Sequence, residues 1–182
     1  MRAALRTLLL APLVLAGCGD GFDPIVFPNP SAPEDVVLSD FVSGTLQQPS
    51  AFDVLGGVPV RTDQSSNWDF VFAVQPGVGP VLQPRGMFDE SETEAGVAVT
   101  DVAFEVLALA PEDGYATDAP TPIAAGDVVV VRSRRDPGFA VRCRLFGKFE
   151  VVGIDLEEGT LSLRHLINPN CERRELTPDE EG

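Results

Sequence analysis

Apolar and polar residues alternate along much of the chain, and this alternation predicts short β-strands. Trp68, Phe70, Phe72 and Val74 recur with a period of two, which places them on one face of a strand over residues 68–74. Residues 36–46 predict an earlier strand, because they are mostly apolar. We expect Trp68, Phe70 and Phe72 to form the core.

Turn residues divide the chain into hairpins. Gly56 and Gly57 lie between residues 51–54 and 58–62, a spacing typical of a hairpin, and Pro59 places its strand at an edge or a bulge. Further strands are predicted over residues 128–134, 139–152 and 160–166, with turns at 76–80, 136–138 and 158–159.

Residues 101–109 differ from this pattern and predict one short helix. Asp101 could cap its start, Phe104 and Leu107 share a face with Ala108, and Pro111 ends it. The sequence therefore predicts a mainly β fold, an antiparallel sheet or sandwich with one short helix. This domain spans residues 36–177 and is followed by an acidic tail, residues 178–182.

The composition supports a folded, turn-rich domain with an acidic surface. Apolar residues make up 44% of the 182 residues, with 17 glycines and 16 prolines. After residue 17 the chain holds eleven basic residues against 28 acidic ones. A surface this acidic repels phosphate backbones, so we expect no nucleic-acid partner.

The first 17 residues have the pattern of an export signal. Arg2 and Arg6 form a positive start, and residues 7–14 are apolar but too short to cross a bilayer. The Leu15-Ala16-Gly17-Cys18 stretch resembles the lipobox of bacterial lipoproteins. This resemblance implies lipidation of Cys18, cleavage before it and a membrane anchor in the cell envelope. Gly19 favours the outer over the inner membrane.

Residues 18–35 are expected to act as a tether between the lipidated Cys18 and the domain. Pro24, Pro28, Pro30 and Pro33 block helix and favour extended backbone. At about 3.1 Å per residue, this segment could hold the domain up to about 50 Å from the lipid.

Cys143 and Cys171 remain once Cys18 carries lipid. An exported compartment is oxidising, so the two thiols predict a disulfide that ties the C-terminal part to the sheet. Separate free thiols are the alternative. A metal site is not expected, because His165 is the only histidine available as a further ligand.

The basic residues gather in the C-terminal half, and three of them suggest an anion site. With a turn centred near Pro137, Arg132 would lie opposite Arg142, and Arg134 would share their face. Like charges directly opposite are destabilising. An anionic ligand, an acidic partner or acids from the N-terminal half would relieve this repulsion, and relief by internal acids or by solvent is favoured over a ligand site. His165 stands alone on a predicted strand, where a structural role is favoured over ligand binding.

The sequence contains no Gly-x-Ser-x-Gly, His-Glu-x-x-His, Walker-type loop or Cys-x-x-Cys motif. The acidic residues 89–94 do not have the spacing of an EF-hand loop, and a solvated loop is favoured over a Ca²⁺ site. We therefore expect no enzyme activity.

Three stretches together resemble the HmuY-like lipoproteins, a family of exported β-rich proteins with haem-binding members. They are residues 52–54 with 66–72, residues 126–132, and residues 146–149 with 160–164. The resemblance implies a β-dominated lipoprotein domain that is not an enzyme. Haem-binding members hold the iron with paired side chains such as His, and this chain offers His165 and Met87. No motif places these two together, so no ligand position carries over.

The sequence as a whole predicts a lipid-anchored exported lipoprotein with a non-catalytic binding or envelope-structural domain and no obligate cofactor. The alternative is a HmuY-like binder of haem or another anionic small ligand. Arg132, Arg134, Arg142 and His165 are the candidate binding residues for that alternative.

Overall fold

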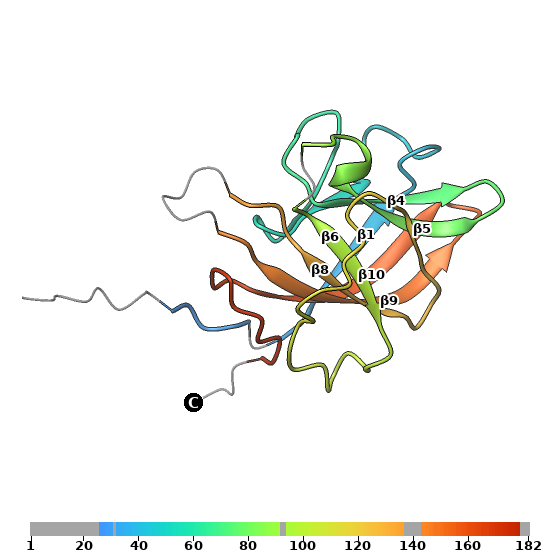
Figure 1. Ribbon diagram of the computed structural model, residues 1–182. Coiled ribbons are helices and arrows are strands. Elements are labelled where there is room, and N and C mark those ends of the chain that lie inside the picture. Colours follow the sequence, from blue (N-terminus) through green and yellow to red (C-terminus); the bar gives the residue numbers. More distant parts are fainter. Residues whose placement is uncertain (1–25, 31, 92–93, 137–142, 179–182) are drawn as a thin grey trace, which may run out of the picture.

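Ten antiparallel strands in two sheets form the domain (Figure 1), which confirms the predicted mainly β fold. The strands over residues 79–84, 96–100 and 121–122 were not predicted. The structure is a computed structural model that describes residues 26–30, 32–91, 94–136 and 143–178. The first sheet has the order β1-β10-β9-β8-β6 and the second has the order β3-β2-β4-β5-β7. The strands are β1 (Glu34–Ser39), β2 (Ala51–Asp53), β3 (Val58–Val60), β4 (Phe70–Gln75), β5 (Gly79–Pro84), β6 (Gly96–Thr100), β7 (Thr121–Pro122), β8 (Val128–Arg132), β9 (Phe146–Asp155) and β10 (Thr160–Asn168), with one 3-10 turn, η1 (Arg85–Met87).

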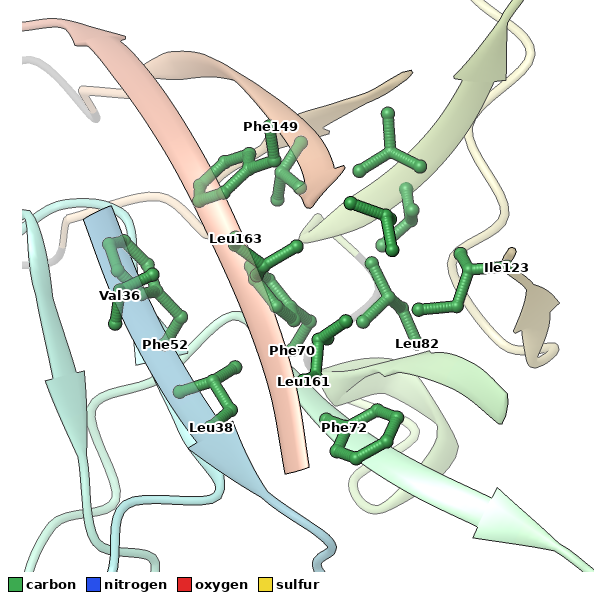
Figure 2. Close-up of a cluster of buried hydrophobic side chains, with 14 of the residues drawn as sticks. Val36, Leu38, Phe52, Phe70, Phe72, Leu82, Ile123, Phe149, Leu161 and Leu163 are labelled. Carbon is green, nitrogen blue, oxygen red and sulfur yellow. The ribbon is translucent and has the colours of Figure 1, made fainter. Parts of the chain in front are cut away.

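The main core lies between the two sheets, where apolar side chains from both meet (Figure 2). Phe52 and Phe70 of the second sheet meet Phe149 of the first edge-on, at centroid distances of 5.2 and 5.4 Å. Such edge-to-face pairs stabilise a core beyond the area that they bury. Within the described ranges, all strands and all buried apolar residues lie between Glu34 and Leu176, so a fragment of residues 19–182 contains this sandwich.

Several predicted turns and edges are confirmed. β2 and β3 form the hairpin around Gly56 and Gly57, and Gly57 adopts a φ of 66° that a side chain would strain. β3 lies at the edge of its sheet, as Pro59 predicted. The turn before β10 contains Gly159 at a φ of 62°.

The first strand is shorter than predicted and starts earlier. β1 begins at Glu34, inside the predicted tether, and ends at Ser39 rather than at Leu46. Asp40 ends it, because its carboxylate accepts the main-chain N–H groups of Val42 and Ser43 and so forms a turn.

The expected placement of Trp68 is wrong in part. Phe70 and Phe72 lie in the main core as predicted. Trp68 is buried too, but in a separate cluster with Ala51 and Val71. The reason is that β4 begins only at Phe70, so the strand alternation does not extend back to Trp68.

The predicted helix over residues 101–109 is also wrong. Val106 and Leu107 both donate to the carbonyl of Ala103, and this single turn does not continue. Residues 108–110 instead pair with 174–176 through two further main-chain hydrogen bonds. We call residues 103–110 the covering segment, because its apolar side chains pack on the first sheet with Val128, Val130, Phe146, Leu166 and Leu176.

Candidate functional site

The described residues bring Asp53, Asp69 and Arg134 together into what we call the ion triad. Asp53 ends β2, Asp69 directly precedes β4 and Arg134 follows β8, so the triad joins the two sheets. Arg134 Nη1 lies 2.9 Å from Asp53 Oδ1 and 3.1 Å from Asp69 Oδ2. The side chain of Arg134 is 10% exposed and that of Asp69 is 0% exposed.

Main-chain groups complete the coordination of Asp69. The N–H groups of Val54 and Arg134 donate to its two carboxylate oxygens at 2.7 and 2.6 Å. Burial raises the pKa of Asp69 to about 6, although Arg134 and both main-chain donors act to lower it. Burial lowers the pKa of Arg134, but Asp69 and Asp53 more than offset this, and its pKa is raised. Arg134 is thus paired with acids of the N-terminal half, which is one of the forms of relief that the sequence suggested.

Arg132 does not form the predicted pair. It lies opposite Phe146 in the β8–β9 ladder, so the expected register with Arg142 is wrong. The turn was placed too early, because β9 starts only at Phe146. Arg142 and the predicted turn at 137–138 lie outside the described residues. The Arg132 guanidinium donates to the carbonyl of Glu94 and lies 4.8 Å from the ring centre of Tyr115.

Two other arginines share a pair of acids near the disulfide. Arg135 lies 3.3 Å from Glu94 and 3.4 Å from Glu172, and Arg144 lies 3.6 and 3.7 Å from the same two carboxylates. Glu94 ends the predicted acidic loop, is 45% exposed and also pairs with these two cations. The sequence carried no signal for this network, because its members are far apart along the chain.

The predicted disulfide between Cys143 and Cys171 is confirmed, with the two Cα atoms 5.1 Å apart. The main chain beside it is also tied down, because the N–H of Glu172 donates to the carbonyl of Arg144 at 2.8 Å. The bond links the residues before β9 to those after β10. It therefore holds the C-terminal part to the first sheet, as expected for a structural bridge.

Lys148 is a buried cation that sequence reasoning missed. It lies on the outer face of β9, where alternation predicts exposure, yet it is only 1% exposed. Its ammonium donates to the carbonyls of Phe104 and Leu107 at 2.7 and 3.1 Å and lies 4.6 Å from the ring centre of Phe104. Burial lowers the pKa of Lys148. The apolar residues of the covering segment, Phe104 and Leu107, were the available signal that this segment covers the outer face of β9.

His165 lies at one end of the sandwich, beside a cavity of about 210 Å³. Its ring stacks on Phe149 at 5.4 Å and meets Phe52 edge-on at 4.9 Å. It is 5% exposed, and its Nδ1 has no hydrogen-bond partner. Burial lowers the pKa of His165, so the ring is neutral at pH 7. Among the described residues, the ring contacts of His165 are with Phe52 and Phe149.

Residues 26–30 lie against the C-terminal part of the domain. The side-chain amide of Asn170 accepts from the main-chain N–H of Phe27 and donates to the carbonyl of the same residue, both at 2.7 Å. The amide of Asn29 donates to the carbonyl of Thr177 at 3.0 Å. Asn170 is itself held by Asn168, whose Oδ1 accepts from it. Part of the predicted tether is thus fixed to the domain.

Within the described ranges there is no group of three or more His, Cys, Asp or Glu side chains placed to hold a metal ion. A search of those same ranges for a helix long and apolar enough to cross a membrane found none. Cys18 and the lipobox lie outside the described residues. Comparisons with models of protein families, with curated proteins and with solved structures gave no match.

Proposed function

We propose that this chain is an exported lipoprotein, anchored to the bacterial cell envelope by lipid on Cys18, whose β-sandwich serves a non-catalytic binding or structural role. The observation that carries the proposal is the Leu15-Ala16-Gly17-Cys18 stretch that follows the apolar residues 7–14. The paired hydrogen bond between Asn170 and the main chain of Phe27 lies nine residues after Cys18. A clamp at this point fixes where the chain leaves the sandwich, and therefore which end of the domain faces the anchor.

The use of the buried charges supports a non-catalytic role. Asp69 and Arg134 join the two sheets, and Lys148 holds the covering segment through main-chain carbonyls. A catalytic acid or base has to reach a substrate proton. These groups instead point to partners inside the fold, where they stabilise it.

Two acyl chains give stable membrane attachment, whereas one is marginal. A chain with 28 acidic residues gains little attraction to an anionic membrane surface. Attachment would then depend on the lipid and not on the protein surface. We propose the outer membrane, because Gly19 follows the lipidated cysteine.

Haem is the alternative ligand that the HmuY-like resemblance implies, and the described residues do not fit it. A haem ligand needs an imidazole nitrogen open to the iron, whereas His165 is 5% exposed and packed between Phe52 and Phe149. The adjacent cavity, at about 210 Å³, is smaller than the roughly 300–1,000 Å³ of typical ligand pockets. Titration of the 19–182 fragment with ferric haem, followed by absorbance, should therefore stay flat. A saturable change that is lost in His165→Ala would establish the alternative.

The anchor is tested by expressing the full chain in bacteria fed an alkyne-tagged fatty acid. The wild-type chain should take up the label and sediment with outer-membrane fractions. Cys18→Ser should take up none, whereas Cys143→Ser should label like the wild type, because only Cys18 lies in the lipobox. Label that persists in Cys18→Ser would contradict the proposal.

A further inference from the structure

Two exposed apolar side chains mark the place where the N-terminal segment leaves the sandwich. Val26 is 58% exposed and Phe27 is 55% exposed. The clamp by Asn170 acts on the main chain of Phe27, so the position of both residues is fixed relative to the domain. In Figure 1 this segment, in blue, leaves the domain at the end opposite to the turn between β4 and β5. The apolar pair thus lies at one end of the molecule.

The charge at this end differs from that of the chain as a whole. Residues 26–30 carry no charged side chain, whereas the chain has a net charge of −15. Among the described residues, the surface beside Val26 and Phe27 is lined by one cation, Arg173, and one carboxylate, Glu175. Their nearest charged atoms are 4.0 Å apart and both side chains are 52% exposed, so the guanidinium is open to solvent. An anionic surface is thus repelled less at this end than by the acidic chain as a whole.

The chain between this surface and the proposed anchor is short. Val26 is the eighth residue after Cys18, and at about 3.1 Å per residue this stretch reaches at most about 25 Å. A short linker gives a tethered group an effective concentration on the order of millimolar. A weak contact between the apolar pair and the membrane is therefore well populated once the lipid on Cys18 is in the bilayer.

We propose that this end of the domain is its membrane-facing surface, with Val26 and Phe27 in the interfacial region of the bilayer and Arg173 at the lipid phosphates. The inference rests on the proposed lipid anchor at Cys18 and adds the surface that meets the membrane. Aromatic and aliphatic side chains bury themselves at the boundary of headgroups and acyl chains. An arginine covers apolar surface with its stem and keeps its charge among the headgroups. The lipid attaches the domain, and this contact orients it.

The test uses the full chain, purified from bacterial membranes and reconstituted into vesicles whose acyl chains carry bromine, which quenches tryptophan emission at short range. Phe27→Trp places a reporter in the proposed contact and keeps an aromatic ring there. Val78→Trp is the matched control, because Val78 is 57% exposed and lies in the β4–β5 turn. The emission of the native Trp68, measured in the wild-type chain, is subtracted. Brominated lipid should quench the emission that Phe27→Trp adds and leave that of Val78→Trp unchanged.

A second change tests which side chains make the contact. In the Phe27→Trp chain, Val26→Asp should reduce the quenching, because a carboxylate resists transfer out of water. Val78→Asp, the same change at the opposite end, should leave the quenching as it was. Both valines are exposed, so neither substitution enters the core.

The outcomes separate this inference from the anchor on which it rests. A chain that does not float with the vesicles overturns the anchor and, with it, the contact. A chain that floats but shows no quenching of Phe27→Trp, or equal quenching of Phe27→Trp and Val78→Trp, keeps the anchor and overturns the contact. Quenching that Val26→Asp does not reduce would overturn it as well.

Discussion

Replacing Arg134 with methionine should destabilise the sandwich more than any change of a surface charge. The substitution keeps an apolar stem but removes the cation from Asp53 and Asp69. Asp69, at 0% exposure, would keep only its two main-chain donors. Two charge-assisted hydrogen bonds are lost, each about 1.5–3 kcal/mol. Breaking a buried pair by removing one partner costs about 3–5 kcal/mol. We therefore expect Arg134→Met to lower the free energy of unfolding at pH 8 by about 3–5 kcal/mol.

The loss of folding free energy in Arg134→Met should depend on pH, because the protonation of Asp69 determines how much the missing cation matters. The pKa of Asp69 in the folded state is raised to about 6, compared with 3.8 for an unperturbed aspartate. A raised pKa contributes stability that is fully present below pH 3.8 and is lost as pH rises through about 6. Removing Arg134 removes a charge that lowers this pKa, so the Asp69 pKa rises further. The variant should therefore be most destabilised above pH 7 and much less so at pH 5, where the carboxyl takes up a proton.

The assay is urea unfolding of the 19–182 fragment at pH 8 and at pH 5. Arg61→Met is the matched control, because Arg61 pairs with Asp63 at the surface with side chains 29% and 33% exposed. Such exposed pairs contribute about 0–1 kcal/mol. A cost for Arg134→Met below about 1 kcal/mol, or the same cost at both pH values, would refute the role given to the ion triad.

Other changes test the remaining contacts. Replacing Cys143 and Cys171 together with serine should lower the free energy of unfolding by about 3–4 kcal/mol, since the bond closes a 28-residue separation; a urea midpoint that reductant does not move would contradict this. Lys148→Met should cost about 1–3 kcal/mol, because the carbonyls of Phe104 and Leu107 lose their donor. Hydrogen exchange should then speed up in the covering segment, and unchanged exchange there would count against the role of Lys148.

Local patterns predicted the strands well, because period-two alternation and turn glycines act over a few residues. The hairpin at Gly56 and Gly57 and the edge position of Pro59 needed nothing more. The disulfide followed from the number of cysteines and the expected compartment. The hairpin and the edge strand depend on residues within one segment, and the disulfide had only two cysteines to join.

The failures have a common cause in contacts between distant segments. The apolar spacing at Phe104 and Leu107 predicted a helix, but residues 108–110 pair with 174–176 instead. Lys148 was not singled out on its strand, yet it is buried and donates to two carbonyls of the covering segment. The register error at Arg132 arose from the placement of a single turn. No local pattern contained the partners of Asp69 or the cavity at His165, because each is built from three distant segments.

The most direct test of the central claim is the mass of the N-terminal peptide of the chain purified from bacterial membranes. The account predicts a peptide that starts at Cys18 and carries the mass of diacylglycerol, with a further acyl chain on its amino group. A peptide that starts elsewhere, or that carries Cys18 as a free thiol, would contradict it.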